Sequence, residues 1–408
     1  MLDVLTHPAY GKLFAAQAIA LVGTGLMSVA LGLLAYDLAG TDAGVVLGTV
    51  FAIKMVAYVG FSPVAHALIE RLPRKAVLIA ADLVRASVAV FLPFIDAVWQ
   101  VYLLIFVLQA ASAAFAPAFQ AVIPDILKDD ARYTRALSLT RLAYDLENLA
   151  SPALAGLLLT FMNFHGLFAG TVAGFLGSAV LVWLAAVPPR APDSAEFGFA
   201  DRLTRGLRLY LATARLRGLL ALSMAAAAPS AFVLVNTVVI VRVRFGGDES
   251  AFAVAMAAFG AGSMLTALIL PRLLERISDR TAMLTGAGAF GLLALVLAAY
   301  AGAAGWPGWN AFLALWALAG MSYAAILTPS GRLLRRSGDA SERPSLFVAQ
   351  FALSHACWLV TYPLAGWVGG AFGLPAALGL LGAIGIAAAG TAAGVWPKCP
   401  PAPAPDPG

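Results

Sequence analysis

Twelve apolar runs of about 20 residues each constrain this chain more than any other feature. They fall roughly at residues 13–36, 44–69, 76–95, 99–122, 137–160, 166–187, 218–241, 251–273, 282–302, 309–331, 345–369 and 373–396. A helix of that length crosses a hydrocarbon core of ~30 Å. Only 12% of the residues are charged, whereas soluble proteins carry about 25%. The sequence therefore predicts an all-α membrane protein with twelve transmembrane helices.

The basic residues predict how these helices are oriented. Loops after even-numbered runs are rich in Arg and Lys, for example at Arg132, Arg202 and Arg336, and loops after odd-numbered runs are nearly bare apart from Arg242 and Arg244. Because positive charge marks the cytoplasmic side, we expect a multi-pass protein of the bacterial inner membrane (plasma membrane) with both termini in the cytoplasm. The net charge of +5 follows from this placement and does not indicate a nucleic-acid partner.

The longest break between runs divides the chain into two halves. Residues 188–217 begin with several prolines and then alternate basic and apolar residues at helical spacing over 199–210. This pattern predicts an amphipathic helix on the inner leaflet, which would join a bundle at 1–187 to a bundle at 218–396. Residues 397–408 are proline-rich and are predicted to form a disordered tail.

A charged hinge occurs once in each half. The first reads Glu70-Arg71-Leu-Pro-Arg74-Lys75, and Glu275-Arg276-Ile-Ser-Asp279-Arg280 follows 205 positions later (275 − 70 = 205). With His66 in front, the first hinge resembles Gly-x-x-x-Asp-Arg-x-Gly-Arg-Arg, the signature of the major facilitator superfamily, although both glycines are replaced and Glu stands for Asp. The likeness covers residues 10 to 396. It implies two six-helix bundles related by a pseudo-two-fold axis along the membrane normal, a secondary transporter, and a monomer.

Finer resemblances point to several branches of this superfamily. Asp82-Leu-Val-Arg85 looks like the macrolide-efflux and siderophore-exporter branches, whereas segments 34–40 and 354–358 look more like the nickel-resistance exporter branch.

The resemblance also implies a cytoplasmic gate around the hinges. Its predicted members are Glu70, Arg71, Arg74, Lys75, Asp82, Arg85, Asp125, Glu275, Arg276 and Arg280. Arg74 and Lys75 are expected to reach Asp125 at the end of run 99–122. Glu70 is expected to cap the start of run 345–369 near Ser345. Asp82 and Arg85 are expected one turn inside run 76–95, and Asp279, which stands where a base is usual, predicts a weaker second hinge.

Polar residues predict a central substrate cavity. The first, fourth, seventh and tenth runs are polar along one face, which matches the helices that line the cavity in the superfamily. In lipid such side chains face protein or water, unless Ser and Thr merely bond to their own helix backbone. With neighbours on the second, fifth and eleventh runs, the predicted cavity residues are Gln17, Thr24, Ser28, Tyr58, Gln109, Asn148, Ser230, Asn236, Tyr323, Trp358 and Tyr362.

Three ionisable residues are predicted to couple protons to transport. Lys54 lies ~15 Å from water along its helix, too far for its stem to reach the interface, so it must face the interior. Asp145 and His355 are the other candidates. Each has a structural alternative: a buried ion pair for Lys54, a helix-end pair with Arg141 for Asp145, and a hydrogen-bonded core residue for His355.

The sequence offers no sign of a metal site or cofactor. Cys357 lies on a different face of the helix from His355, and no His-rich tract or phosphate-binding loop is present. We therefore expect no enzyme and predict a proton-coupled exporter of a small amphiphilic organic solute, with the solute, protons and the lipid bilayer as partners. A nickel or cobalt exporter and a non-transporting membrane sensor or scaffold remain the alternatives.

Overall fold

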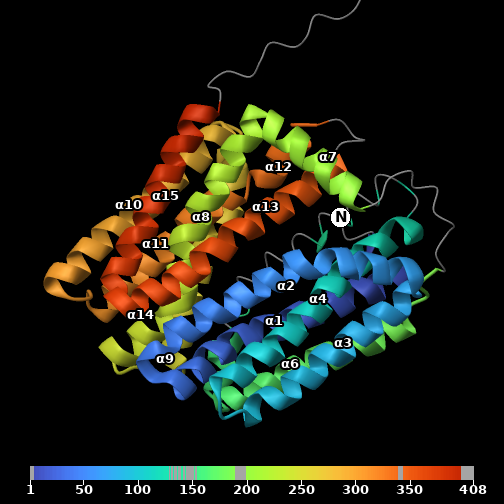
Figure 1. The fold of residues 1–408 in the computed structure, drawn as a ribbon, viewed down its shortest axis with the longest axis horizontal. Helices are drawn as coiled ribbons and strands as arrows, with labels where there is room; N and C mark the ends of the chain where they lie inside the picture. Colours follow the sequence, from blue (N-terminus) through green and yellow to red (C-terminus); the bar gives the residue numbers. More distant parts are fainter. Residues whose placement is uncertain are drawn as a thin grey trace, which may run out of the picture.

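The computed structural model describes residues 4–127, 154–188, 199–338 and 343–396, together with scattered single residues between 129 and 151. The side chains of residues 59–71 and of a few other helix positions lie outside the description. All regular structure in the described residues is helical. Figure 1 shows two groups of long helices, one built from the N-terminal half of the chain and one from the C-terminal half.

The N-terminal half consists of long helices separated by short turns. They are α1 (Pro8–Ala39), α2 (Ala43–Arg71), α3 (Arg74–Phe91), α4 (Val98–Ile126) and α6 (Phe164–Leu184). Gly40, at φ 54°, ends α1 in a conformation that L side chains rarely adopt. Pro73 precedes α3 and keeps the hinge short. Run 137–160 lies mostly outside the described residues.

The C-terminal half repeats this plan. Its elements are α8 (Ala214–Val239) with η4 (Ile240–Arg244), α9 (Glu249–Leu273), α10 (Asp279–Ala304), α11 (Trp309–Leu327), α12 (Ser330–Arg335), α13 (Arg343–Pro363) with η5 (Leu364–Val368), α14 (Gly369–Phe372) and α15 (Leu374–Val395). In the part of the chain that the structure describes, these helices therefore cover eleven of the twelve predicted runs. By length and composition alone, the described residues contain nine segments able to span a membrane, the first of which, Pro8–Tyr58, joins α1 to part of α2.

Helix pairing shows the same order in both halves. In the N-terminal half α1 packs on α6, α2 on α4, and α3 on both α4 and α6. In the C-terminal half the matching pairs are α8 with α15, α9 with α11, and α10 with both α11 and α15. The chain therefore folds as two pseudo-symmetric helical bundles, as the repeated hinge predicts.

Small residues bring paired helices close together. A Cβ on Gly262 of α9 would overlap the Ala317 carbonyl oxygen, and one on Gly320 of α11 would overlap the Phe259 carbonyl oxygen. In lipid, where apolar burial between helices gains little, such close backbone contact drives association.

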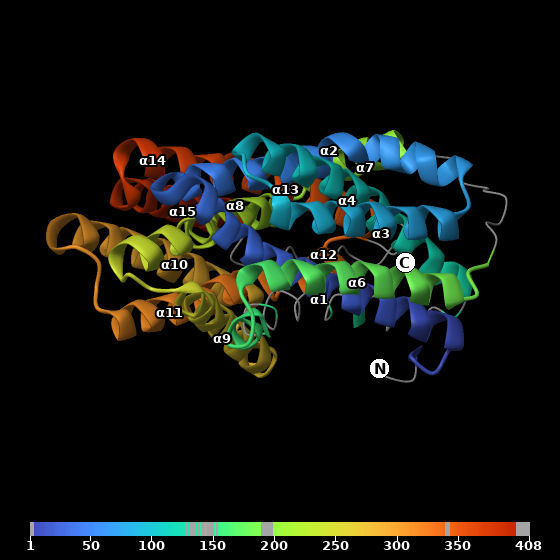
Figure 2. The same ribbon diagram turned by 90° about the horizontal axis from the view of Figure 1, so that it is seen from below.

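The predicted amphipathic helix is present as α7 (Phe199–Ala212), which packs mainly on α13. Tyr210 is fully buried, and its hydroxyl donates to Gln350 Oε1. Gln350 Nε2 in turn donates to Ser223 Oγ at 3.2 Å. Polar bonds therefore anchor α7 to the C-terminal half. Figures 1 and 2 place α7 at one end of the molecule and α14 at the other.

Candidate functional site at the contact between the halves

The two halves meet most closely where α2 crosses α13, η5 and α8. A Cβ on Gly48 would lie 2.7 Å from the Tyr362 carbonyl oxygen and 3.1 Å from Gly366 Cα, so the backbones touch. A Cβ on Gly370 would meet Val45 at 2.6 Å. We call this crossing, formed by Gly44, Gly48, Gly366 and Gly370, the glycine seal. It lies toward the end that carries the α1–α2 connection, which the basic-loop pattern assigns to the periplasm.

Two hydrogen bonds support the same contact, one across it and one beside it. Trp367 Nε1 donates to Thr49 Oγ1 at 3.1 Å, which joins η5 to α2. Within the C-terminal half, Asn236 Nδ2 donates to the Ala365 carbonyl at 2.9 Å and holds α8 against η5. The seal is therefore fixed by both backbone packing and polar bonds.

Sequence reasoning missed the seal, although its signal was available. Gly44 and Gly48 are four residues apart, and so are Gly366 and Gly370. Two glycines at this spacing form a flat strip along a helix, which is a known pattern for close helix contact in membranes.

Next to the seal a row of aromatic and basic side chains joins α2 to α13. We call Phe51, Lys54, Tyr58, Phe351, His355, Trp358 and Tyr362 the aromatic seam. Ring centroids of Phe51 and Tyr362 are 4.8 Å apart, and those of Tyr58 and His355 are 5.7 Å apart. Within α13, Trp358 stacks on Tyr362 at 4.9 Å. The residues recur every three or four positions, so each helix contributes one face.

Lys54 and His355 both lie close to the Tyr58 ring. The Lys54 ammonium nitrogen is 6.0 Å from the Tyr58 ring centroid, a distance at which a cation and an aromatic face attract each other. Lys54 is also close enough to His355 for their charges to interact. His355 Nδ1 is 2.7 Å from the Phe351 carbonyl oxygen. Because a carbonyl only accepts, Nδ1 carries a proton there and Nε2 is left to gain or lose one.

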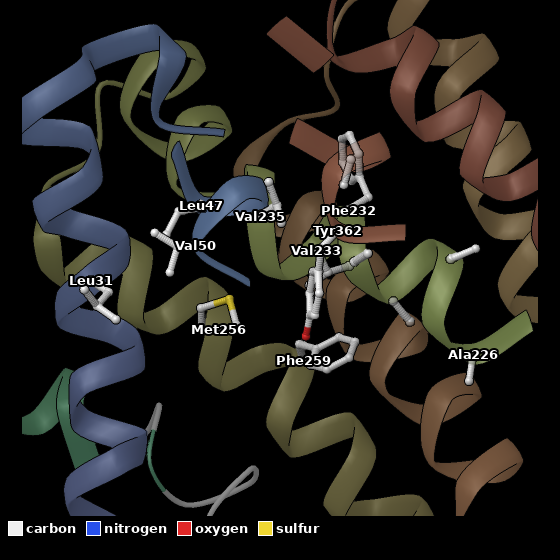
Figure 3. Close-up of a cluster of buried hydrophobic side chains, with 14 of the residues drawn as sticks. Leu31, Leu47, Val50, Ala226, Phe232, Val233, Val235, Met256, Phe259 and Tyr362 are labelled. Carbon is white, nitrogen blue, oxygen red and sulfur yellow. The ribbon is translucent and has the colours of Figure 1, made fainter. Parts of the chain in front are cut away.

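Figure 3 shows how the apolar core continues past this seam. Leu31, Leu47 and Val50 of the first half lie across from Met256 and Phe259 of the second, and the Tyr362 hydroxyl lies next to the Phe259 ring. The ring of Tyr323 of α11 also packs on Phe259, at 5.7 Å between centroids. Tyr362 and Tyr323 thus both approach α9, where both halves supply side chains.

Other predicted cavity residues make bonds within their own helices. Thr24 donates to the Ala20 carbonyl at 2.9 Å, and Ser28 donates to the Thr24 carbonyl at 3.0 Å. Ser230 donates to the Ala226 carbonyl. Gln17 and Gln109 are buried. That these residues contact substrate stays a prediction. Asn236, another predicted cavity residue, is buried next to the glycine seal.

The hinges form contacts at the opposite end. Arg74 Nη1 contacts Asp125 Oδ2, as expected. Lys75 does not bond to Asp125; its ammonium group donates to the Ala185 carbonyl at 3.0 Å, at the end of α6. Arg280 donates to the carbonyls of Ala393 and Trp396 at the end of α15. Glu275 and Arg276 are exposed. The side chains of Glu70, Arg71, Asp145 and Asn148 lie outside the described residues.

Asp82 and Arg85 lie deeper than predicted. Because α3 begins at Arg74, both are more than two turns inside it, and both are buried. They form an ion pair, and Ser178 Oγ donates to Asp82 Oδ2 at 2.7 Å. The Arg85 guanidinium carbon is 4.3 Å and 4.6 Å from the ring centroids of Phe115 and Phe175. The expectation of a position one turn from the helix end is wrong, because α3 begins at Arg74. The buried pair ties α3 to α4 and α6.

Sequence and structure comparisons agree on one family. The model of the Major Facilitator Superfamily matches residues 13–246 and 219–408. Macrolide efflux protein A of Streptococcus pyogenes is 25% identical over 43% of this chain and 44% of its own length. The MFS-type transporter YfiS of Bacillus subtilis (strain 168) is 26% identical over 64% of this chain and 63% of its own. The chain thus matches less than two thirds of the length of these relatives.

Among solved structures, a bacterial homologue of the human lysosomal transporter Spinster, in an inward-facing and unoccupied conformation, aligns with a TM-score of 0.73. It is 14% identical and covers 97% of this chain and 98% of its own. This agreement supports the fold alone. Since the family model also spans both halves, the chain belongs to the Major Facilitator Superfamily.

Proposed function

We propose that this protein exports a small amphiphilic organic solute by alternating access, driven by protons that enter in exchange. The observation that carries the proposal is the aromatic seam, which places Lys54, Tyr58 and His355 at the contact between the two halves. A rocking motion of the halves would change the surroundings of these groups more than those of any group inside one bundle. Their protonation can therefore be linked to the motion.

Chemistry at the seam favours an organic solute. Phe51, Trp358 and Tyr362 offer flat apolar faces, and Tyr58 adds a hydroxyl. Rings of this kind bind apolar and ring-containing molecules while the hydroxyl orients polar groups. The relatives named macrolide efflux proteins suggest a solute of this class. Lys54, while charged, would repel a divalent cation, which disfavours nickel or cobalt. No group of three potential metal-binding side chains occurs within the described part of the chain.

A proton on Lys54 or His355 would link the two steps. Two basic groups beside one ring disfavour double protonation, because like charges in an apolar environment repel. One proton could therefore be shared near Tyr58 and released when the halves rock. A solute that enters the seam would compete with this proton, which gives exchange.

Purified protein in liposomes tests this proposal. A pH gradient, acid on the side that the topology assigns to the periplasm, should drive transport of a radiolabelled macrolide. Lys54→Met should abolish pH-driven transport while the protein still inserts, and His355→Ala should shift its pH dependence. Lys12→Met is the matched control, because Lys12 is exposed and, among the described residues, bonds to the Leu184 carbonyl alone, at a helix end.

Full pH-driven transport by Lys54→Met would refute the coupling role and leave Lys54 a structural residue. Transport of Ni²⁺ or Co²⁺ instead of the macrolide by the unmodified protein would replace the solute assignment with the metal alternative. No transport of any tested probe would favour a sensor or scaffold.

A further inference from the structure

A second polar site lies beside the glycine seal, away from the aromatic seam. It is a cavity of about 220 Å³ between the two halves. The N-terminal half contributes Thr41, Asp42 and Gly44, and the C-terminal half contributes Asn236, Gly369 and Gly370 among others. Its walls therefore belong to both halves, and opening this end would take the cavity apart.

Asn236 presents a buried amide oxygen to this region. The side chain is only 1% exposed, and its Nδ2 is fixed by the bond to the Ala365 carbonyl, which can only accept. The amide orientation is thereby set, so Oδ1 points away from Ala365. Oδ1 has no hydrogen-bond partner among the described atoms. An oxygen buried in this way is costly unless a donor or a cation reaches it.

The glycine backbone packs directly against that oxygen, so no side chain covers it from these positions. A Cβ on Gly44 would lie 2.5 Å from Asn236 Oδ1, and one on Gly369 would lie 3.3 Å from it. Both glycines also line the cavity. Any larger residue at position 44 would displace Oδ1 from the cavity wall.

The remaining polar groups of the cavity are also oxygens. Asp42 supplies a carboxylate and Thr41 a hydroxyl, both from the short turn between α1 and α2. None of the described residues lining the cavity is basic. The nearest arginine along α8 and η4, Arg242, has its guanidinium carbon 5.5 Å from the Tyr36 ring centroid, outside the cavity lining. One carboxylate with neutral oxygen ligands suits a cation of single charge.

We propose that this cavity binds a small monovalent cation, either an alkali ion such as Na⁺ or a primary ammonium group, through Asp42 and the Asn236 amide oxygen. Because ligands come from both halves, the bound cation would stabilise the closed arrangement of this end. Binding itself is independent of the proposed transport, whereas its effect on opening rests on alternating access.

Thermal unfolding of the full chain in detergent tests binding without any transport. A ligand that binds only the folded state raises the midpoint as its concentration grows. At constant ionic strength, NaCl, KCl and methylammonium chloride are compared with choline chloride, whose cation is too bulky for the Asp42–Asn236 ligands. We expect NaCl or methylammonium chloride to raise the midpoint. A rise with NaCl identifies the ligand as an alkali ion, and a rise with methylammonium chloride identifies it as a primary ammonium group.

Asp42→Asn keeps the size of the side chain and removes its charge, and should raise the half-effective cation concentration at least tenfold. Asp37→Asn is the matched control, since Asp37 is exposed at the same end and does not line the cavity. Asn236→Leu should abolish the response to the cation. If Asn236→Leu does not fold, Asp42→Asn still tests the proposal, because Asp42 lies in an exposed turn where the substitution should be tolerated. Equal midpoints in all four salts, or a response unchanged by Asp42→Asn, would overturn the proposal and leave a cavity that holds only water.

Discussion

Replacing Gly48 by Ala should open the glycine seal. The new Cβ would lie 2.7 Å from the Tyr362 carbonyl oxygen, whereas ordinary contact begins at 3.4 Å, so the helices must separate by about 0.7 Å. The opposing atoms are backbone, which cannot rotate away. Overpacking of this kind costs about 1–3 kcal/mol. This cost exists only in the sealed state, in which α2 touches α13. The higher helix propensity of Ala, ~1 kcal/mol, stabilises the sealed and the open state equally and therefore cancels.

The ratio of sealed to open protein should therefore fall by roughly 5- to 150-fold, since each 1.4 kcal/mol is tenfold. A cysteine at Val45, in a chain whose Cys357 and Cys399 are replaced by Ser, reports opening through its reaction with an impermeant maleimide. Gly288→Ala is the matched control, because no atom of the described residues lies within 4 Å of the Cβ it would add. Equal labelling rates in Gly48→Ala and Gly288→Ala would show that this crossing does not close the molecule.

Three further changes test the bundles and a helix start. Arg85→Met should lower the free energy of unfolding by about 3–5 kcal/mol by leaving Asp82 buried without its partner, and adding Asp82→Leu should restore much of it in detergent denaturation. Tyr210→Phe should cost about 1–3 kcal/mol through the unpaired Gln350 and should speed proteolysis at the exposed Arg208, with Tyr300→Phe, an exposed tyrosine, as control. Bonds from the Ala251 amide and the Ser250 hydroxyl lower the pKa of Asp248, so its stabilising effect is present above about pH 4 and is lost as the pH falls through the lowered pKa. Asp248→Ala should therefore cost at most about 1 kcal/mol at pH 7 and less near pH 3, measured as unfolding midpoints at the two pH values.

Hydropathy and charge predicted most of the fold because the bilayer imposes them. A helix must be apolar for about 20 residues, and basic loops must stay on one side, whatever the details of packing. The amphipathic pattern over 199–210 likewise marks α7, because its period is local. The pattern over 199–210 could not predict which helix α7 packs against. Burial of Tyr210 against α13 depends on residues 140 positions away.

The sequence predicted which residues form the aromatic seam better than it predicted how they are arranged. Lys54 and Tyr58 are four residues apart on one helix, so their common face follows from sequence alone. His355 lies beside the same ring because of the way α2 crosses α13. The close backbone contact at Gly48 and Gly366 determines that crossing, and the sequence pattern of either helix alone does not reveal it. Asp82 was placed too near the helix end because the run was taken to begin at its apolar residues, whereas α3 begins at the charged Arg74.

The two hinges show what the repeat preserves. Arg74 and Asp279 occupy matching positions (279 − 74 = 205), yet their charges are opposite. Arg74 pairs with Asp125 at the end of α4, whereas Asp279 pairs with Arg332 and Arg336 after α11. Asp279 thus keeps an ion pair of its own because its partners changed sign with it, and the weaker second hinge stays a prediction.

At the next position the charge does not change. Lys75 and Arg280 (280 − 75 = 205) each donate to carbonyls at the C-terminal end of a helix, α6 in one half and α15 in the other. A helix C-terminus always carries partial negative charge, so only a cation suits it. An ion pair between two side chains can be inverted without loss, but a side chain that bonds to a helix end cannot. This difference explains why one position of the hinge kept its charge while its neighbour did not.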